Sequence, residues 1–197
     1  MSRFESALDR FDAANAEDPG TEEVDGEPVA KALIYGRRMS AQLTSFRPDA
    51  SEALKLAARA QHLRRFEVPR DRYPMDRPGY HRWRTDLGKL HAKWAGEIMQ
   101  DVGYEPEMVA RVRDILRKKG LRTDPDVQAL EDVACLVFLE HYYGPFIDEK
   151  DDEKVVVILR KTWAKMSEKG QAAAARVPLG GRAAALMKRA LDEDASS

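Results

Sequence analysis

The stretch PDVQALEDVACLVFL, residues 125–139, decides the fold class. Asp124 and Pro125 form a typical helix start, because the aspartate caps free N–H groups and proline suits the first turn. From Val133 to Leu139 the residues are apolar nearly all round the helix, as in the buried centre of a helical domain. We therefore predict an all-α fold built around this segment.

Segments with helical periodicity fill the rest of the chain, separated by proline, glycine and aspartate. The stretch 67–79 contains three prolines and is predicted to be a loop. The pattern indicates about seven to eight helices. Seven of them are expected at 2–16, from a start with Pro28 in the first turn to before Pro48, at 49–68, 80–102, 106–119, from 125, and at 155–166. The end of the chain is expected to form short helical segments around Pro178 and Gly180.

Composition places the chain among ordinary globular proteins. Its 197 residues fit a single domain, and its 33 basic and 34 acidic side chains give a net charge of −1, which excludes a polycation that coats DNA. The lone Cys135 lies in an apolar run and is expected to be buried. No signal peptide or membrane-spanning run is visible, so we expect a soluble, cytoplasmic protein with no membrane partner. Residues 194–197 are expected to be a disordered tail.

One third of the chain is strongly basic. Between residues 59 and 93 ten basic side chains stand against four acidic ones, and aromatic residues are interspersed. This composition favours a ligand that carries phosphate, with arginines as its contacts. The same pattern is also typical of a solvated surface with arginine–carboxylate pairs. The candidate ligand-binding residues are Tyr35, Arg38, Gln61, Arg65, Arg82 and Trp83.

Four polar residues occupy otherwise apolar helix faces: Gln61, His62, His91 and Asp132. A buried polar side chain needs a hydrogen-bond partner, and a buried carboxylate needs a donor, a cation or a metal. Each of them is explained either by a satisfied hydrogen bond in the core or by a place in the wall of a pocket. In the second case His62, His91 and Asp132 would converge around one cavity.

The chain resembles the HD-domain phosphohydrolase superfamily and, more closely, the family catalogued as domain of unknown function 4202. The resemblance is carried by LKLAARAQH (54–62), LHAKWAGEIMQDVGYEPEMVARVRDILRKKG (90–120) and QALEDVACLVFL (128–139). It implies an HD-like core at 28–142 and a C-terminal helical extension at 143–193. It places the four usual metal-binding positions on Tyr35, Gln61, His62 and Asp132, and His91 matches a histidine of some members.

The resemblance implies a site made of His62, His91 and Asp132, which would bind a metal or transfer protons. Tyr35 and Gln61 are poor ligands for a divalent transition metal, so we expect metal binding to be weak or absent. With a metal, the site would activate water for hydrolysis. Without one, His62 held by Asp132 would act as a general base.

Three functions remain open at this point. The first is an HD-like enzyme that acts on a phosphorylated small molecule or nucleotide through this degenerate site. The second is a non-catalytic HD-like module that binds a nucleotide or RNA, with Trp83 or Tyr80 stacked on a base. The third is a helical partner protein. The sequence does not indicate the oligomeric state.

Overall fold

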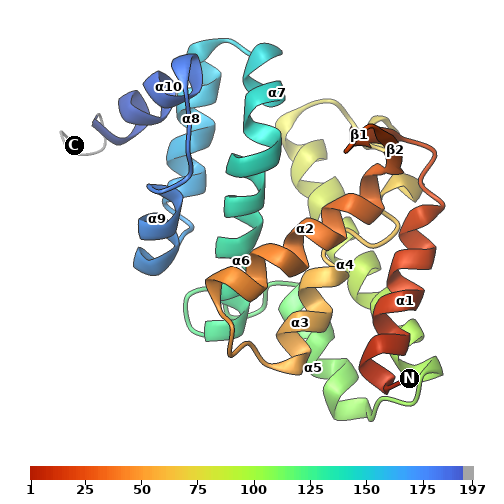
Figure 1. The fold of residues 1–197 in the computed structure, drawn as a ribbon. Helices are drawn as coiled ribbons and strands as arrows, with labels where there is room; N and C mark the ends of the chain where they lie inside the picture. The colour runs from red at the N-terminus through yellow and green to blue at the C-terminus, as the bar shows by residue number, and fades with distance from the viewer. Residues whose placement is uncertain (193–197) are drawn as a thin grey trace. The chain divides into compact units, whose positions relative to one another are not determined.

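The computed structural model describes residues 1–192 and is dominated by helices (Figure 1). The predicted all-α class is confirmed, and the described residues add only a two-stranded hairpin to the helices. The chain forms two compact units, Met1–Leu130 and Glu131–Ser197, with the boundary inside α6 (Pro125–Val137). The predicted division into a core at 28–142 and an extension at 143–193 stays a prediction.

The first unit packs its helices around the short helix α3. The elements before α6 are α1 (Arg3–Ala16), β1 (Thr21–Val24), β2 (Glu27–Ala30), α2 (Lys31–Phe46), α3 (Glu52–Arg59), α4 (Arg77–Asp101) and α5 (Pro106–Leu116). Helix α3 contacts α1, α2 and α5, and α4 packs against α5 and α1. An eight-residue helix is marginal in water on its own, so the burial of Leu54, Leu56 and Ala57 stabilises it.

A β-hairpin replaces the predicted start of the second helix. Asp25 and Gly26 both adopt positive φ, 53° and 85°, which two-residue hairpin turns require and which glycine adopts without strain. Pro28 therefore lies in β2, opposite Glu23, and not in a first helical turn as predicted. Helix α2 begins only at Lys31. The Asp25-Gly26 pair is a hairpin signal in the sequence. The predicted helix start rested instead on the preference of proline for the first turn of a helix.

Two further predictions about element bounds were wrong. The third helix ends at Arg59 and does not continue toward Pro69, so Gln61 and His62 lie in the turn that follows it. The fourth helix begins at Arg77, inside the predicted loop, because Asp76 caps it by accepting the Gly79 N–H at 2.7 Å.

Helix α5 ends earlier than Gly120, the stop predicted from the sequence. Its last residue is Leu116, and Lys118 adopts the left-handed conformation that often follows a helix, with φ of +55°. Gly103 fulfils the predicted role after α4, with φ of +85°.

The second unit begins within α6. After it come a π-helical turn η3 (Phe138–Tyr142), α7 (Tyr143–Asp148), α8 (Asp152–Trp163), α9 (Glu168–Ala174) and α10 (Gly181–Asp192). Helix α10 packs against α8 and α7. Cys135 is buried, as predicted. The predicted tail, 194–197, lies outside the described residues. Within residues 1–192, none of the helices combines the length and apolar character needed to cross a membrane.

The close approach of α2 and α3 generates a stability prediction. A Cβ atom added at Gly36 would lie 2.9 Å from the Arg59 carbonyl oxygen, which is backbone and cannot rotate away. We expect Gly36→Ala to lower the free energy of unfolding by about 1–3 kcal/mol. Denaturant titration followed by circular dichroism measures the change.

Gly88→Ala provides the control. Gly88 also lies within a helix, but the nearest atom to its added Cβ is 4.0 Å away. Alanine there should be neutral or stabilising by up to about 1 kcal/mol. Equal stability of the two variants would contradict the close packing of α2 on α3.

Candidate functional site

The site is organised by the turn that follows α3. The backbone N–H of Arg64, which has a left-handed φ of +51°, donates to Oδ1 of the buried Asn15 at 2.9 Å. The Leu63 carbonyl accepts a 2.7 Å hydrogen bond from Nδ1 of His91 on α4. Side chains from two other helices thus satisfy the polar backbone groups of a part-buried turn, as burial requires.

Arg65 follows this turn and is held between two rings. Its Nη1 donates to Nε2 of His62 at 3.1 Å, and its guanidinium lies 4.7 Å from the ring centre of Trp83. The Trp83 indole in turn donates to the Val68 carbonyl at 2.9 Å. On the other side Tyr35 stacks on His62, with ring centres 4.1 Å apart and planes 14° apart. The arginine therefore has a defined position on a rigid aromatic support.

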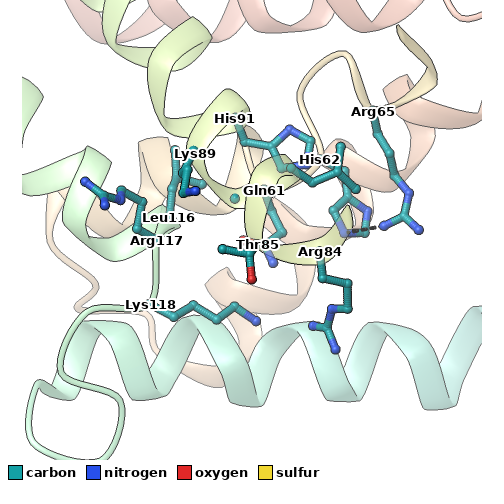
Figure 2. A pocket seen from close by; sticks show the side chains of 12 residues that line it. Gln61, His62, Arg65, Arg84, Thr85, Lys89, His91, Leu116, Arg117 and Lys118 are labelled. Atoms are coloured by element: carbon teal, nitrogen blue, oxygen red, sulfur yellow. Dashed lines mark hydrogen bonds between the residues drawn. The ribbon is translucent and has the colours of Figure 1, made fainter. Parts of the chain in front are cut away.

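A cavity of about 260 Å³ opens at this turn, between α4 and the end of α5 (Figure 2). Every charged residue of its lining is a lysine or arginine, and acidic residues are absent from it. Its polar and charged lining residues are Gln61, His62, Arg65, Arg84, Thr85, Lys89, His91, Arg117 and Lys118. Such a wall attracts an anion and repels a cation.

The cations of the wall are only partly neutralised. Lys89 pairs with Asp86 at 3.2 Å. Arg65, Arg84 and Arg117 have no carboxylate partner among residues 1–192. Burial lowers the pKa of Arg65 from its usual value, since few waters solvate its charge. A desolvated guanidinium without a carboxylate is strongly stabilised by a bound anion.

Lys118 reaches the cavity from a strained backbone. A positive φ at a residue with a Cβ costs roughly 1–2 kcal/mol, and such strain gathers at functional sites. In Figure 2 the Lys118 side chain extends from the end of α5 along the cavity toward Thr85 and Gln61. The left-handed turn after α5 thus places an ammonium group in the wall.

Both histidines of the cavity are neutral. An arginine can only donate, so Nε2 of His62 accepts and its proton is on Nδ1. Desolvation by burial, followed by the charge of Arg65, holds the pKa of His62 well below its usual range. Burial also lowers the pKa of His91 to about 4, although the hydrogen bond to the Leu63 carbonyl opposes the shift.

This arrangement suits anion binding better than metal binding or proton transfer. Two neutral imidazoles beside five cations, without a carboxylate, do not fit a divalent metal. Among residues 1–192, no three His, Cys, Asp or Glu side chains are grouped to hold one. A general base works best with a pKa near the working pH, whereas His91 has a pKa of about 4 and the lone pair of His62 is engaged by Arg65.

A second hollow of about 370 Å³ continues the cationic wall along α4 and α5. It shares Lys89 and Arg117 with the cavity and adds Lys93 and Arg113. Arg113 lies close against α4 because Gly96 has no side chain, and its Nε donates to the Ala92 carbonyl at 3.3 Å. The positive charge therefore extends past the mouth of the cavity.

The sequence profile of the family described as domain of unknown function, DUF4202, matches residues 5–187. The chain belongs to this family. Comparison with curated proteins and with solved structures found no match. The DUF4202 match includes the whole basic cavity, from Gln61 to Lys118, and most of the second unit.

The structure brings together four of the residues that the sequence singled out in this DUF4202 chain. Gln61, His62, Arg65 and His91 line one cavity, and the rings of His62 and His91 have centres 5.8 Å apart. Tyr35 stands behind them through its stacking on His62.

Besides Tyr35, three predicted ligand contacts lie outside the lining of the cavity. Arg38 forms an ion pair with Glu22, and Arg82 is exposed on α4. Trp83 is buried, with its indole N–H bound to the Val68 carbonyl and its face under Arg65. It therefore supports the site and is not presented for stacking on a base.

Asp132 belongs to the second unit, whereas the lining of the cavity comes from the first. Its carboxylate accepts hydrogen bonds from the Ser167 N–H at 2.8 Å and the Ser167 hydroxyl at 2.6 Å. That hydroxyl also accepts the Gly170 N–H and so caps α9. The Asp132 side chain, only 2% exposed, thus has donors within its own unit. Of His62, His91 and Asp132, which were predicted to share one cavity, His62 and His91 lie together in its lining.

The sequence did not single out the remaining polar and charged residues of the wall: Arg84, Thr85, Lys89, Arg117 and Lys118. Arg84 and Lys89 lay within the recognised basic stretch, but nothing distinguished them from the exposed Arg82. Residues two apart on a helix point to nearly opposite sides. Which side of α4 lines the cavity depends on how α4 packs against the turn after α3, and neither segment alone shows this.

The neutral histidines generate a pH prediction. Because the folded pKa of His91, about 4, lies below the unfolded value of about 6.5, the unfolded chain binds a proton that the folded one excludes. Stability should therefore fall as pH drops through this window, by at most about 1.4 kcal/mol per pH unit from this group. Ring ¹⁵N NMR should show His91 neutral, with its proton on Nδ1, at pH values above about 5.

His91→Asn offers the comparison, since the asparagine amide retains a donor toward the Leu63 carbonyl but does not titrate. Its stability should depend less on pH in the same window. A His91 ring that titrates near its usual pKa would contradict the buried, neutral assignment.

Asp132 generates a second stability prediction. Ser167→Ala removes one donor to a buried carboxylate and the cap of α9 together. We expect a loss of about 1–3 kcal/mol in denaturant unfolding. The exposed cap Asp151 is the matched control, because Asp151→Ala removes the acceptor for the Lys154 N–H and an exposed ion pair with the Lys154 ammonium, and it should lose about 1 kcal/mol or less. A larger loss for Asp151→Ala than for Ser167→Ala would contradict the contribution assigned to the hydrogen bond between Ser167 and Asp132.

Proposed function

We propose that the first unit of this chain is an HD-like helical module that binds the phosphate group of a small molecule in the basic cavity. The observation that carries the proposal is the lining itself, which holds five cations and no acid around two neutral histidines. A phosphate group supplies the negative charge that Arg65, Arg84 and Arg117 lack among residues 1–192, and acceptor oxygens for their N–H groups.

The HD-like part of the proposal rests on the residues that the resemblance assigns. The resemblance places two of the four usual metal-binding positions on Gln61 and His62, which follow α3 and line the cavity. It places another of these positions on Tyr35, which stacks on His62. These three positions are therefore neighbours, as members of one site should be. Tyrosine and glutamine replace metal ligands there, and this exchange favours an anion over a metal.

Binding is favoured over hydrolysis and over RNA recognition. Metal-assisted hydrolysis needs ligands that the cavity does not offer. Of the two rings expected to stack on an RNA base, Trp83 lies under Arg65, and the exposed Tyr80 is outside the lining of the cavity. The cavity, at about 260 Å³, is near the lower end of the range of ligand pockets, roughly 300–1,000 Å³. It therefore suits a small phosphorylated molecule.

Isothermal titration calorimetry with inorganic phosphate tests the proposal. Arg84 lines the cavity, and Arg82, two residues earlier on the same helix, does not. We expect Arg84→Ala to weaken phosphate binding about tenfold, the worth of one charge-assisted hydrogen bond, and Arg82→Ala to leave it unchanged. Affinity should fall as salt is raised, since added ions screen the exposed cations.

Lys118→Gly separates binding from folding. Glycine adopts the left-handed backbone without strain, so this variant should be more stable than the wild type by about 1 kcal/mol while it binds phosphate less tightly. Absence of phosphate binding by the wild-type protein, or equal losses in Arg82→Ala and Arg84→Ala, would overturn the proposal.

A further inference from the structure

The wall of the cavity carries two buried hydrogen-bond acceptors that no donor among residues 1–192 reaches. His91 must donate from Nδ1, because its partner is a carbonyl, so Nε2 carries a lone pair. That Nε2 and Oε1 of Gln61 are both buried and have no partner among the described residues. The two side chains are 4% and 7% exposed. An unmet buried acceptor costs roughly 1–3 kcal/mol, so each favours a ligand that donates.

Thr85 adds a third acceptor to the lining, at an exposed position. Its hydroxyl donates to the His81 carbonyl at 2.9 Å, so its remaining lone pairs are available to accept. Figure 2 shows Thr85 and Gln61 close together in the view, with Lys118 extending toward them. The lining therefore offers charged donors from its arginines and lysines, and neutral acceptors from Gln61, Thr85 and His91.

The phosphoryl group of a monoester dianion meets only half of this wall. Its oxygens accept hydrogen bonds and match the arginines and lysines, but it has no N–H or O–H for the acceptors. A hydroxyl group on the ligand supplies an O–H donor. It donates to a neutral acceptor without adding charge. Because a buried acceptor is costly to leave unmatched, a ligand with hydroxyls should be selected over one that lacks them.

We infer that the ligand is a phosphate monoester of a small polyhydroxylated molecule, of the sugar-phosphate class. Its phosphoryl group faces the cations, and its hydroxyl groups donate to Nε2 of His91 and Oε1 of Gln61. The inference rests on the proposed phosphate-binding function and names the class of ligand for that site. The cavity of about 260 Å³ admits one small molecule and excludes long chains.

The experiment compares two phosphate monoesters by calorimetry on the full chain. Ribose 5-phosphate has hydroxyl groups, whereas methyl phosphate has none, and their phosphoryl groups carry the same charge. We expect the wild-type protein to bind ribose 5-phosphate at least about tenfold more tightly, because donors on the ligand then meet acceptors on the wall.

Two variants test which residues cause the preference for ribose 5-phosphate over methyl phosphate. Gln61→Met removes the acceptor and keeps the length of the side chain, so the fold should be no less stable. His91→Asn removes Nε2 and keeps a donor for the Leu63 carbonyl. Each should lower the preference for ribose 5-phosphate over methyl phosphate about tenfold, because only ribose 5-phosphate has hydroxyl donors for the lost acceptor. Thermal unfolding of both variants confirms that they are folded.

The outcomes separate the two proposals. Equal affinity of the wild type for both esters overturns the hydroxyl inference and leaves the phosphate site standing. A preference for ribose 5-phosphate that survives in both variants also overturns it, because the acceptors then lie elsewhere. Binding of neither ester, together with no binding of inorganic phosphate, overturns the phosphate site itself.

Discussion

The hydrogen bond from His91 to the Leu63 carbonyl is the contact on which the cavity depends. It joins the turn after α3 to the middle of α4, and these two segments supply most of the wall. It also fixes the imidazole tautomer, and so decides which nitrogen faces a ligand as an acceptor. One backbone carbonyl thus sets both the position of the wall and its hydrogen-bonding character.

The support around this contact explains why a short turn is well defined. Asn15 holds the Arg64 N–H, and the Trp83 indole holds the Val68 carbonyl. Arg65 then lies between Trp83 and His62, which limits the rotamers that a long side chain would otherwise sample. A donor whose rotamer freedom is already restricted loses less entropy when an anion arrives.

Sequence periodicity was sufficient for the helices, and for the apolar centre from Val133 to Leu139, because a helical stripe is a local property. It failed where a local signal competed with another, as at Pro28, and where tertiary contacts ended an element, as at Arg59. Gln61 and His62 were recognised as residues in need of partners. Their neighbours Arg84 and Lys118 come from distant segments, and no spacing in the sequence joins them.

The concentration of cations in the cavity and the adjoining hollow has a consequence for how ligands arrive. The chain as a whole is nearly neutral, with 33 basic and 34 acidic residues, so little attraction extends into bulk solvent. At physiological ionic strength a surface charge is screened within about 8 Å. Small anions should therefore meet the protein by ordinary diffusion and be captured only at the mouth of the cavity. Long polyanions, which depend on an extended basic face for steering, gain little from such a field.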